Sequence, residues 1–191
     1  MKTSMDFRTI AIAAFVLLIV LVLIRAAILR RQGVKAIVFG KTDKSDFLLV
    51  LPILFFIYSL VGLPLPELLR HKAIDSNILG WCGAVLCAAA LVWFAVTLQT
   101  FGRSFRVGID EDTKNALITS GTFSLSRNPL YVGFDAFFIG QMLIAPNLAS
   151  LIVAVFFGAA IHRQILREEK FLRAHYGLEY ADYSSKVRRY L

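Results

Sequence analysis

The chain has 191 residues, of which 58% are hydrophobic and 18% are charged, and its mean hydropathy is +0.68. About half the residues of an ordinary soluble domain are apolar, so this composition excludes that class and predicts an all-α integral membrane protein forming a single domain over residues 1–191. The formal net charge of +8 raises the question of nucleic-acid binding, but the sequence contains no Cys/His finger, basic helix or RNA-binding signature. We therefore expect no nucleic-acid partner.

The first predicted membrane span is the apolar run Thr9–Ile24, bracketed by Arg8 and Arg25. A signal peptide is the alternative, but "RAAILRR" follows the run where a small-x-small cleavage site would be needed. The second predicted span begins at Phe47, continues past Leu63 and ends in "LPLPE", because proline removes a backbone donor and blocks continuation of a helix.

The third predicted span runs from Ile78 to about Leu98 and contains both cysteines, which we interpret as small apolar residues. The fourth begins at Leu130 and the fifth ends near Ile161. The motif "APN" at 145–147 is a tight-turn signal between them. Because both arms are short, we expect a helical hairpin inside the membrane, which brings the predicted number of transmembrane helices to five.

The basic residues are distributed unevenly between the two predicted sides. Segments 25–46, 99–129 and 162–191 hold seventeen of the 21 lysines and arginines. The positive-inside rule therefore places these segments and the C-terminus in the cytosol, and the N-terminus outside. Chemistry that uses a water-soluble cofactor is expected on the cytosolic segments. The three histidines show no metal-ligand spacing, so no metal site is expected.

The polar motif "SRNPLY" at 126–131 precedes the fourth apolar run. Asn is a preferred N-cap and Pro is favoured at the first helical position, so Asn128 and Pro129 are predicted to open this helix. Its free N–H groups and the Arg127 cation would form an anion site, with Tyr131 one turn inside at the interface. The residues alone favour a simpler interpretation, a capped helix with an interfacial aromatic residue.

The charged segment "HRQILREEKFLRAHYGLEYADYSSKVRRYL" follows the fifth span. Glu169 and Arg173 have the i, i+4 spacing of a surface ion pair, whereas Glu168 has no cation at that spacing and is a candidate for another role. Gly177 is expected to end the helix. An amphipathic helix on anionic lipid is the alternative for this tail.

Asp135 lies one turn after Tyr131 on the same helix face. Ionisable groups within membranes are costly and usually functional, but near the interface a structural Asp is nearly as reasonable.

Two of these segments resemble one family. "LITSGTFSLSRNPLYVGF" and "EEKFLRAHYGLEYADYSSKVRRY" are similar, in order and spacing, to the two sequence blocks of the isoprenylcysteine carboxyl methyltransferases and the related phospholipid methyltransferases. The resemblance covers about residues 99–191, which it implies form a methyltransferase core after three N-terminal helices in 1–98. Two linked motifs at matching spacing are a fairly specific signal.

The resemblance implies that S-adenosylmethionine binds at the cytosolic face. The matching positions are Asn115, Leu117, Ile118, Phe123, Arg127, Asn128, Pro129, Leu130, Tyr131 and Glu168. Asn115 and Asn128 occupy positions where the family often has His, which argues against an essential imidazole base at either place. Arg189 matches the arginine that ends the second block, and Arg188 replaces the family's proline. Gln164 replaces an arginine that contacts substrate in the carboxyl methyltransferases.

The substrate is expected to be lipid-like, and two chemistries remain open. For carboxyl O-methylation, Arg163, Arg167 or Arg189 would hold the anionic group. For phospholipid amine N-methylation, Asp135 or Glu169 would be the candidate base, because an amine must first lose a proton. Two further alternatives are an NADPH-dependent membrane steroid or enoyl reductase, and a non-catalytic membrane scaffold.

Overall fold

The computed structural model describes residues 7–32, 54, 66–70, 74, 76–102 and 116–191. Within these ranges the chain is helical and contains no β-strand, which confirms the all-α prediction for the described residues. The elements are α1 (Phe7–Arg31), α3 (Glu67–Arg70), α4 (Asn77–Phe101), the 3-10 helix η3 (Gly121–Ser124), α5 (Pro129–Ile144), α6 (Leu148–Tyr176) and α7 (Leu178–Lys186).

Among the described residues, three helices, α1, α4 and α6, are long and apolar enough to cross a membrane, and α5 is a shorter apolar helix. The first and third predicted spans lie within α1 and α4, and the predicted fourth helix differs from α5 by one residue at its start. Apart from residue 54, the predicted second span lies outside the described residues. A count of five spans therefore stays a prediction.

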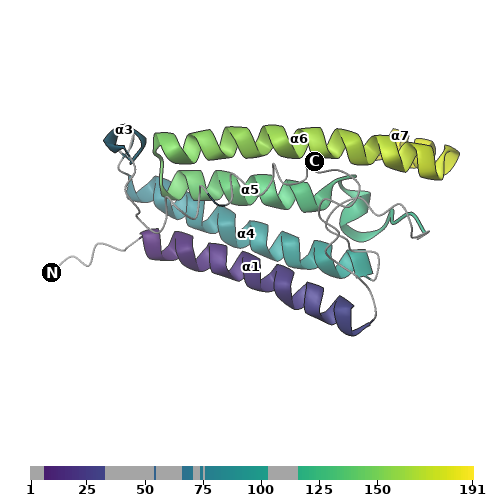
Figure 1. The fold of residues 1–191 in the computed structure, drawn as a ribbon, viewed down its shortest axis with the longest axis horizontal. Helices are drawn as coiled ribbons and strands as arrows, with labels where there is room; N and C mark the ends of the chain where they lie inside the picture. The colour runs from purple at the N-terminus through teal and green to yellow at the C-terminus, as the bar shows by residue number, and fades with distance from the viewer. Residues whose placement is uncertain (1–6, 33–53, 55–65, 71–73, 75, 103–115) are drawn as a thin grey trace.

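Helices α1, α4, α5 and α6 form an elongated bundle in which α1, α4 and α6 run in one direction and α5 runs in the other (Figure 1). The ends of α1, α4 and α6 and the start of α5 consequently lie at one end of the bundle. Helices α4 and α5 approach closely because glycines face each other: a Cβ added at Gly83 would lie 2.6 Å from the Gly140 carbonyl oxygen.

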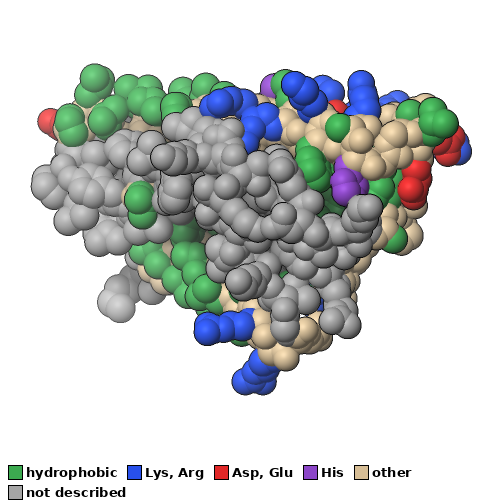
Figure 2. Space-filling view, turned by 45° about the vertical axis from the view of Figure 1, so that its right-hand side comes forward, with side chains coloured by type: hydrophobic (Ala, Val, Ile, Leu, Met, Phe, Trp, Pro, Cys, Tyr) green, Lys and Arg blue, Asp and Glu red, His purple; other side chains and the backbone are tan. Residues whose placement is uncertain are grey.

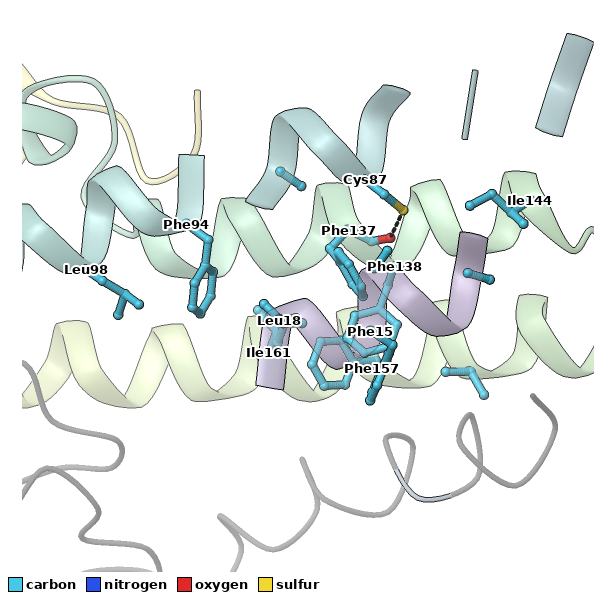
Figure 3. Close-up of a cluster of buried hydrophobic side chains, with 14 of the residues drawn as sticks. Phe15, Leu18, Cys87, Phe94, Leu98, Phe137, Phe138, Ile144, Phe157 and Ile161 are labelled. Carbon is cyan, nitrogen blue, oxygen red and sulfur yellow. Dashed lines mark hydrogen bonds between the residues drawn. The ribbon is translucent and has the colours of Figure 1, made fainter. Parts of the chain in front are cut away.

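The core combines aliphatic side chains with phenylalanines that four helices contribute (Figure 3). Phe138 of α5 and Phe157 of α6 have ring centroids 4.1 Å apart, and Phe15 of α1 packs on Phe138 with an edge-to-face contact. From α4, the Cys87 Sγ lies 3.6 Å from the Phe137 carbonyl oxygen, which agrees with the interpretation of this cysteine as a core residue. In addition, the buried amide of Gln141 donates to the Ala11 carbonyl oxygen at 3.1 Å, which joins α5 to α1.

Residues 145–147 connect α5 to α6, as the turn motif predicted. Asn147 caps α6 reciprocally with Ser150: the Asn147 Oδ1 accepts from the Ser150 N–H at 2.8 Å, and the Ser150 Oγ accepts from the Asn147 N–H at 3.2 Å. At the far end of α6, Gly177 takes a φ of +54° and separates it from α7. The chain then turns back, so the C-terminus lies beside α6 and not beyond α7 (Figure 1).

Candidate functional site

The motif "SRNPLY" opens α5 as predicted, with Asn128 at the N-cap position and the buried Pro129 as the first helical residue. The side chain of Asn128 does not cap the helix, however. Its Nδ2 instead donates to the Glu169 Oε1 and to the Arg189 carbonyl oxygen, both at 3.2 Å. A buried carboxylate from another helix has thus replaced the local capping bond that the motif suggests.

The buried carboxylate of Glu169 is the centre of a group that we name the Glu169 cluster: Arg127, Asn128, Glu169 and Arg189. Arg189 donates to both carboxylate oxygens of Glu169, from Nε to Oε1 at 3.1 Å and from Nη2 to Oε2 at 2.9 Å. The Arg127 Nη2 lies 3.2 Å from the Glu169 Oε1. The expected surface pair between Glu169 and Arg173 is therefore wrong, since Glu169 is buried and Arg173 is exposed. Two cations from outside α6 neutralise the carboxylate instead.

The same contacts fasten the C-terminal tail over the start of α5. The Arg127 N–H donates to the Arg188 carbonyl oxygen at 2.9 Å, and the Ser126 Oγ donates to the Arg189 carbonyl oxygen at 3.2 Å. The Arg127 Nη1 also donates to the Ser184 carbonyl oxygen at 3.2 Å. The hydrogen bond that Arg189 donates to Glu169 raises the pKa of the Arg189 guanidinium above its ordinary value, so Arg189 is a permanent cation here.

Next to this cluster lies a more exposed group that we name the Glu168 row: Tyr131, Gln164, Arg167 and Glu168. The Tyr131 hydroxyl donates to the Glu168 Oε1 at 2.5 Å, and the Gln164 Nε2 donates to the same oxygen at 3.0 Å. The Arg167 Nη1 donates to the Gln164 Oε1 at 3.2 Å. Tyr131, Arg167 and Glu168 are half-buried, so a ligand has access to a carboxylate that α5 and α6 hold in place.

The remaining predicted residues have varied environments. Phe123 is buried, its ring lies 4.8 Å from that of Phe101, and its carbonyl oxygen accepts from the Tyr183 hydroxyl at 2.7 Å. Leu117, Ile118 and Leu130 are half-buried. Arg163 is exposed, and no hydrogen bond or ion pair joins it to the described members of either group. Asn115 lies outside the described residues.

The sequence interpretation missed a third group, formed by Asp135 of α5, His162 of α6 and Tyr190 of the tail. The His162 Nδ1 and the Tyr190 hydroxyl are 2.6 Å apart, and the two rings are stacked with centroids 6.2 Å apart. Asp135 interacts electrostatically with both residues. Burial, followed by the charge of Asp135, raises the pKa of Tyr190. From the sequence, the histidines are considered only as metal ligands, and this contact is not predicted because Tyr190 is 28 residues away from His162 in the chain.

Exposed cations accompany these groups on α6. Figure 2 shows Lys and Arg side chains gathered along the upper edge of the molecule, where α6 runs, beside an apolar stretch of the same edge. Arg163, Lys170 and Arg173 are exposed on this helix. Among the described residues, no group of three or more His, Cys, Asp or Glu side chains is arranged to hold a metal ion.

A cavity of about 850 Å³ lies at the other end of the bundle, where α5 meets α6. Its lining is apolar apart from Glu67 and Asn147, and includes Leu79, Met142, Pro146 and Leu151. Asn147 and Glu168 are 21 positions apart on one helix, or about 30 Å at 1.5 Å per residue. This cavity is therefore separate from the polar groups described above.

Comparison with known proteins identifies the family of this chain. The family model described as phospholipid methyltransferase matches residues 78–179, just over half of the chain. The chain belongs to the phospholipid methyltransferase family, which confirms the resemblance drawn from the two motifs.

Curated relatives extend the comparison. A protein-S-isoprenylcysteine O-methyltransferase of Saccharomyces cerevisiae is 33% identical over 95 residues, covering 48% of this chain and 40% of the relative. A probable protein-S-isoprenylcysteine O-methyltransferase of Oryza sativa subsp. japonica is 31% identical over 110 residues, covering 56% and 58% respectively. The corresponding protein of Dictyostelium discoideum is 28% identical over 115 residues, covering 57% and 47%. The chain thus spans about half the length of the curated relatives it matches.

Proposed function

We propose that the protein is an S-adenosylmethionine-dependent membrane methyltransferase that forms a methyl ester on the carboxylate of a lipid-like acceptor of the isoprenylcysteine type. The observation that carries this proposal is the Glu168 row, in which a half-buried carboxylate is held between α5 and α6 by Tyr131 and Gln164. Membership of the family and the names of the relatives support methyl transfer and an isoprenylcysteine acceptor.

The donor set of the row fits the cofactor. S-adenosylmethionine carries an ammonium group and ribose hydroxyls, which are hydrogen-bond donors suited to a carboxylate such as Glu168. Arg127 and Asn128 fix α5 against α6 through Glu169, and their direct contact with the cofactor stays a prediction.

The chemistry needs positioning more than proton transfer. When bound, the cofactor would supply an electrophilic methyl group to an acceptor carboxylate oxygen, with its sulfur leaving as a neutral thioether. No proton moves, so no base is required. The protein contributes by holding the two reactants in line and by excluding water through the packed α5–α6 interface.

We propose that the site faces the cytosolic surface of a five-span protein, with α5 and α6 as a membrane hairpin, the N-terminus outside, and residues 99–191 as the catalytic core after three N-terminal helices. The common direction of α1, α4 and α6 supports this topology, because Arg30 and Arg31, Arg127 and the charged part of α6 then lie at the same end of the bundle. A lipid acceptor reaches such a site laterally from the bilayer, while the cofactor arrives from water.

Among the arginines predicted to bind the anionic group of the acceptor, Arg167 is the one located within the Glu168 row. It is half-buried within the Glu168 row, whereas Arg163 is exposed and Arg189 is held by Glu169. We therefore assign attraction of an anionic head group to Arg167, with Arg163 as a peripheral cation.

A second candidate is N-methylation of a phospholipid amine. The observation that favours it is Asp135, a carboxylate on the α5–α6 interface that carboxyl methylation does not need as a base. The description of the matching family model supports the same alternative.

One experiment separates these reactions. Membranes containing the protein are incubated with S-adenosylmethionine labelled in the methyl group, and the lipid fraction is then hydrolysed in alkali. Base-labile label is expected for the ester, and base-stable label in a head group would indicate N-methylation. Calorimetry of the purified protein with S-adenosylhomocysteine and with NADPH is the companion measurement. Affinity for NADPH alone would indicate a reductase, and affinity for neither would indicate a scaffold.

A further inference from the structure

Asp135 and His162 are the two ionisable side chains between positions 132 and 162, a stretch that includes most of α5 and the apolar half of α6. They come from different helices, yet they interact electrostatically. Ionisable groups in a membrane-embedded region are costly and are generally found facing one another or a functional site. Asp135 and His162 both interact with Tyr190, and the cofactor role proposed for the Glu168 row does not account for these interactions.

The geometry leaves one nitrogen of His162 available. The Nδ1 lies 2.6 Å from the Tyr190 hydroxyl, and Tyr190 is half-buried against the core. In the imidazolium, and in the neutral tautomer whose Nδ1 accepts from Tyr190, the Nε2 carries a proton and is a donor. The His162 residue is exposed, so this donor is accessible from outside the bundle.

Asp135 and His162 lie on the side of the Glu168 row from which the lipid acceptor would approach. Asp135 is four residues beyond Tyr131 on α5, or about 6 Å, and His162 is six residues before Glu168 on α6, or about 9 Å. Both displacements lead from the charged end of the helices toward their apolar part. This is the direction from which a lipid acceptor approaches.

We propose that His162 binds the carboxylate of the lipid acceptor through its Nε2–H, with Tyr190 and Asp135 as positioning residues. The inference rests on the proposed carboxyl methylation and names the group that receives its substrate. Tyr190 fixes the imidazole ring through Nδ1, while Asp135 offsets a positive charge on the ring. This offset keeps the acceptor oxygen nucleophilic, because a site with excess positive charge would stabilise the carboxylate too strongly in the ground state.

A purely structural explanation makes a different prediction. If Asp135 and His162 served only to neutralise each other within the bundle, their removal would change stability but would leave the affinity for acceptor unaltered. The Michaelis constant for the acceptor therefore distinguishes the two explanations.

The test uses the full chain in lipid nanodiscs, with an N-acetylated S-isoprenylcysteine as the acceptor and labelled S-adenosylmethionine as the donor. For His162→Ala we expect KM for the acceptor to rise about tenfold or more, the loss associated with a hydrogen bond to a charged group. His162→Gln, which keeps an N–H donor, should recover part of this loss. Tyr190→Phe should raise the same KM by a smaller factor. The dissociation constant for S-adenosylhomocysteine should stay within about twofold of the wild-type value, because the Glu168 row is intact.

His175→Ala is the matched control, since this exposed histidine stacks on Phe171 at the far end of α6. An unchanged acceptor KM in His162→Ala, with wild-type protein active on the carboxylate, would refute the inference and leave the proposed function intact. Wild-type protein that binds S-adenosylhomocysteine but transfers label only to a head-group amine would refute both. Retained S-adenosylhomocysteine affinity in His162→Ala confirms that the variant is folded.

Discussion

Replacement of Glu169 by Gln tests whether the Glu169 cluster holds the C-terminal tail onto the bundle. The substitution keeps the size of the side chain but removes its charge, so the Arg127 guanidinium, whose side chain is 11% exposed, loses its buried counter-ion. Removing one partner of a buried ion pair costs about 3–5 kcal/mol. The side chain of Arg189 is 35% exposed, so water compensates part of the second pair and its share is small.

We therefore expect Glu169→Gln to lower the free energy of unfolding by about 3 kcal/mol, near the lower end of that range, and the Tm by about 6–12 °C for a chain of this size. Thermal unfolding in detergent, followed by tryptophan fluorescence, measures the change. Glu179→Gln is the control, because Glu179 is exposed on α7. A Glu169→Gln variant within 1 kcal/mol of the Glu179→Gln variant would refute the assignment of the cluster as the fastening of the tail.

Three further predictions follow from other parts of the structure. Glu168→Gln should weaken binding of S-adenosylhomocysteine about tenfold or more in calorimetry, with little loss of stability, and unchanged affinity would contradict the role of the row. Gly140→Ala should lower stability by about 1–3 kcal/mol, because the added Cβ would lie 2.7 Å from the Cys87 Sγ, whereas Gly158→Ala meets no atom within 4 Å and should be neutral or stabilising in thermal unfolding. Burial raises the pKa of Tyr183 to about 12, while an unfolded tyrosine titrates near pH 10. The contribution of this raised pKa to the free energy of unfolding is complete below about pH 10 and is lost progressively toward pH 12. Tyr183→Phe should therefore flatten this part of a curve of stability against pH.

Local signals predicted the elements that local chemistry controls. Asn128 and Pro129 start α5 at the expected place, and the three residues of the "APN" motif form the turn before α6. Hydropathy located α1 and α4, because long apolar runs have few alternatives to a buried or membrane-spanning helix. Glu168 was singled out as a candidate for a role other than a surface pair, and it lies between Tyr131 of α5 and Gln164 of α6.

The roles of those glutamates could not be assigned in full from the sequence. An i, i+4 pattern describes a single helix, but the cations that neutralise Glu169 are Arg127 and Arg189, 42 and 20 positions away. Only the packing of α6 on the start of α5 and on the tail brings them together. Tyr190 reaches His162 for the same reason, since the chain turns back after α7.

Arg189 and Tyr190 are consecutive residues, and each contacts a different part of α6. The first holds Glu169, beside the residues assigned to the methyl donor, and the second holds His162, assigned to the acceptor. Two adjacent Cα atoms are 3.8 Å apart, so neither residue can leave its partner by a large distance without displacing the other. Detachment of this short segment would thus release Glu169 and His162 in a single motion, and protection of the tail from proteases would measure how well the proposed donor and acceptor sites are assembled.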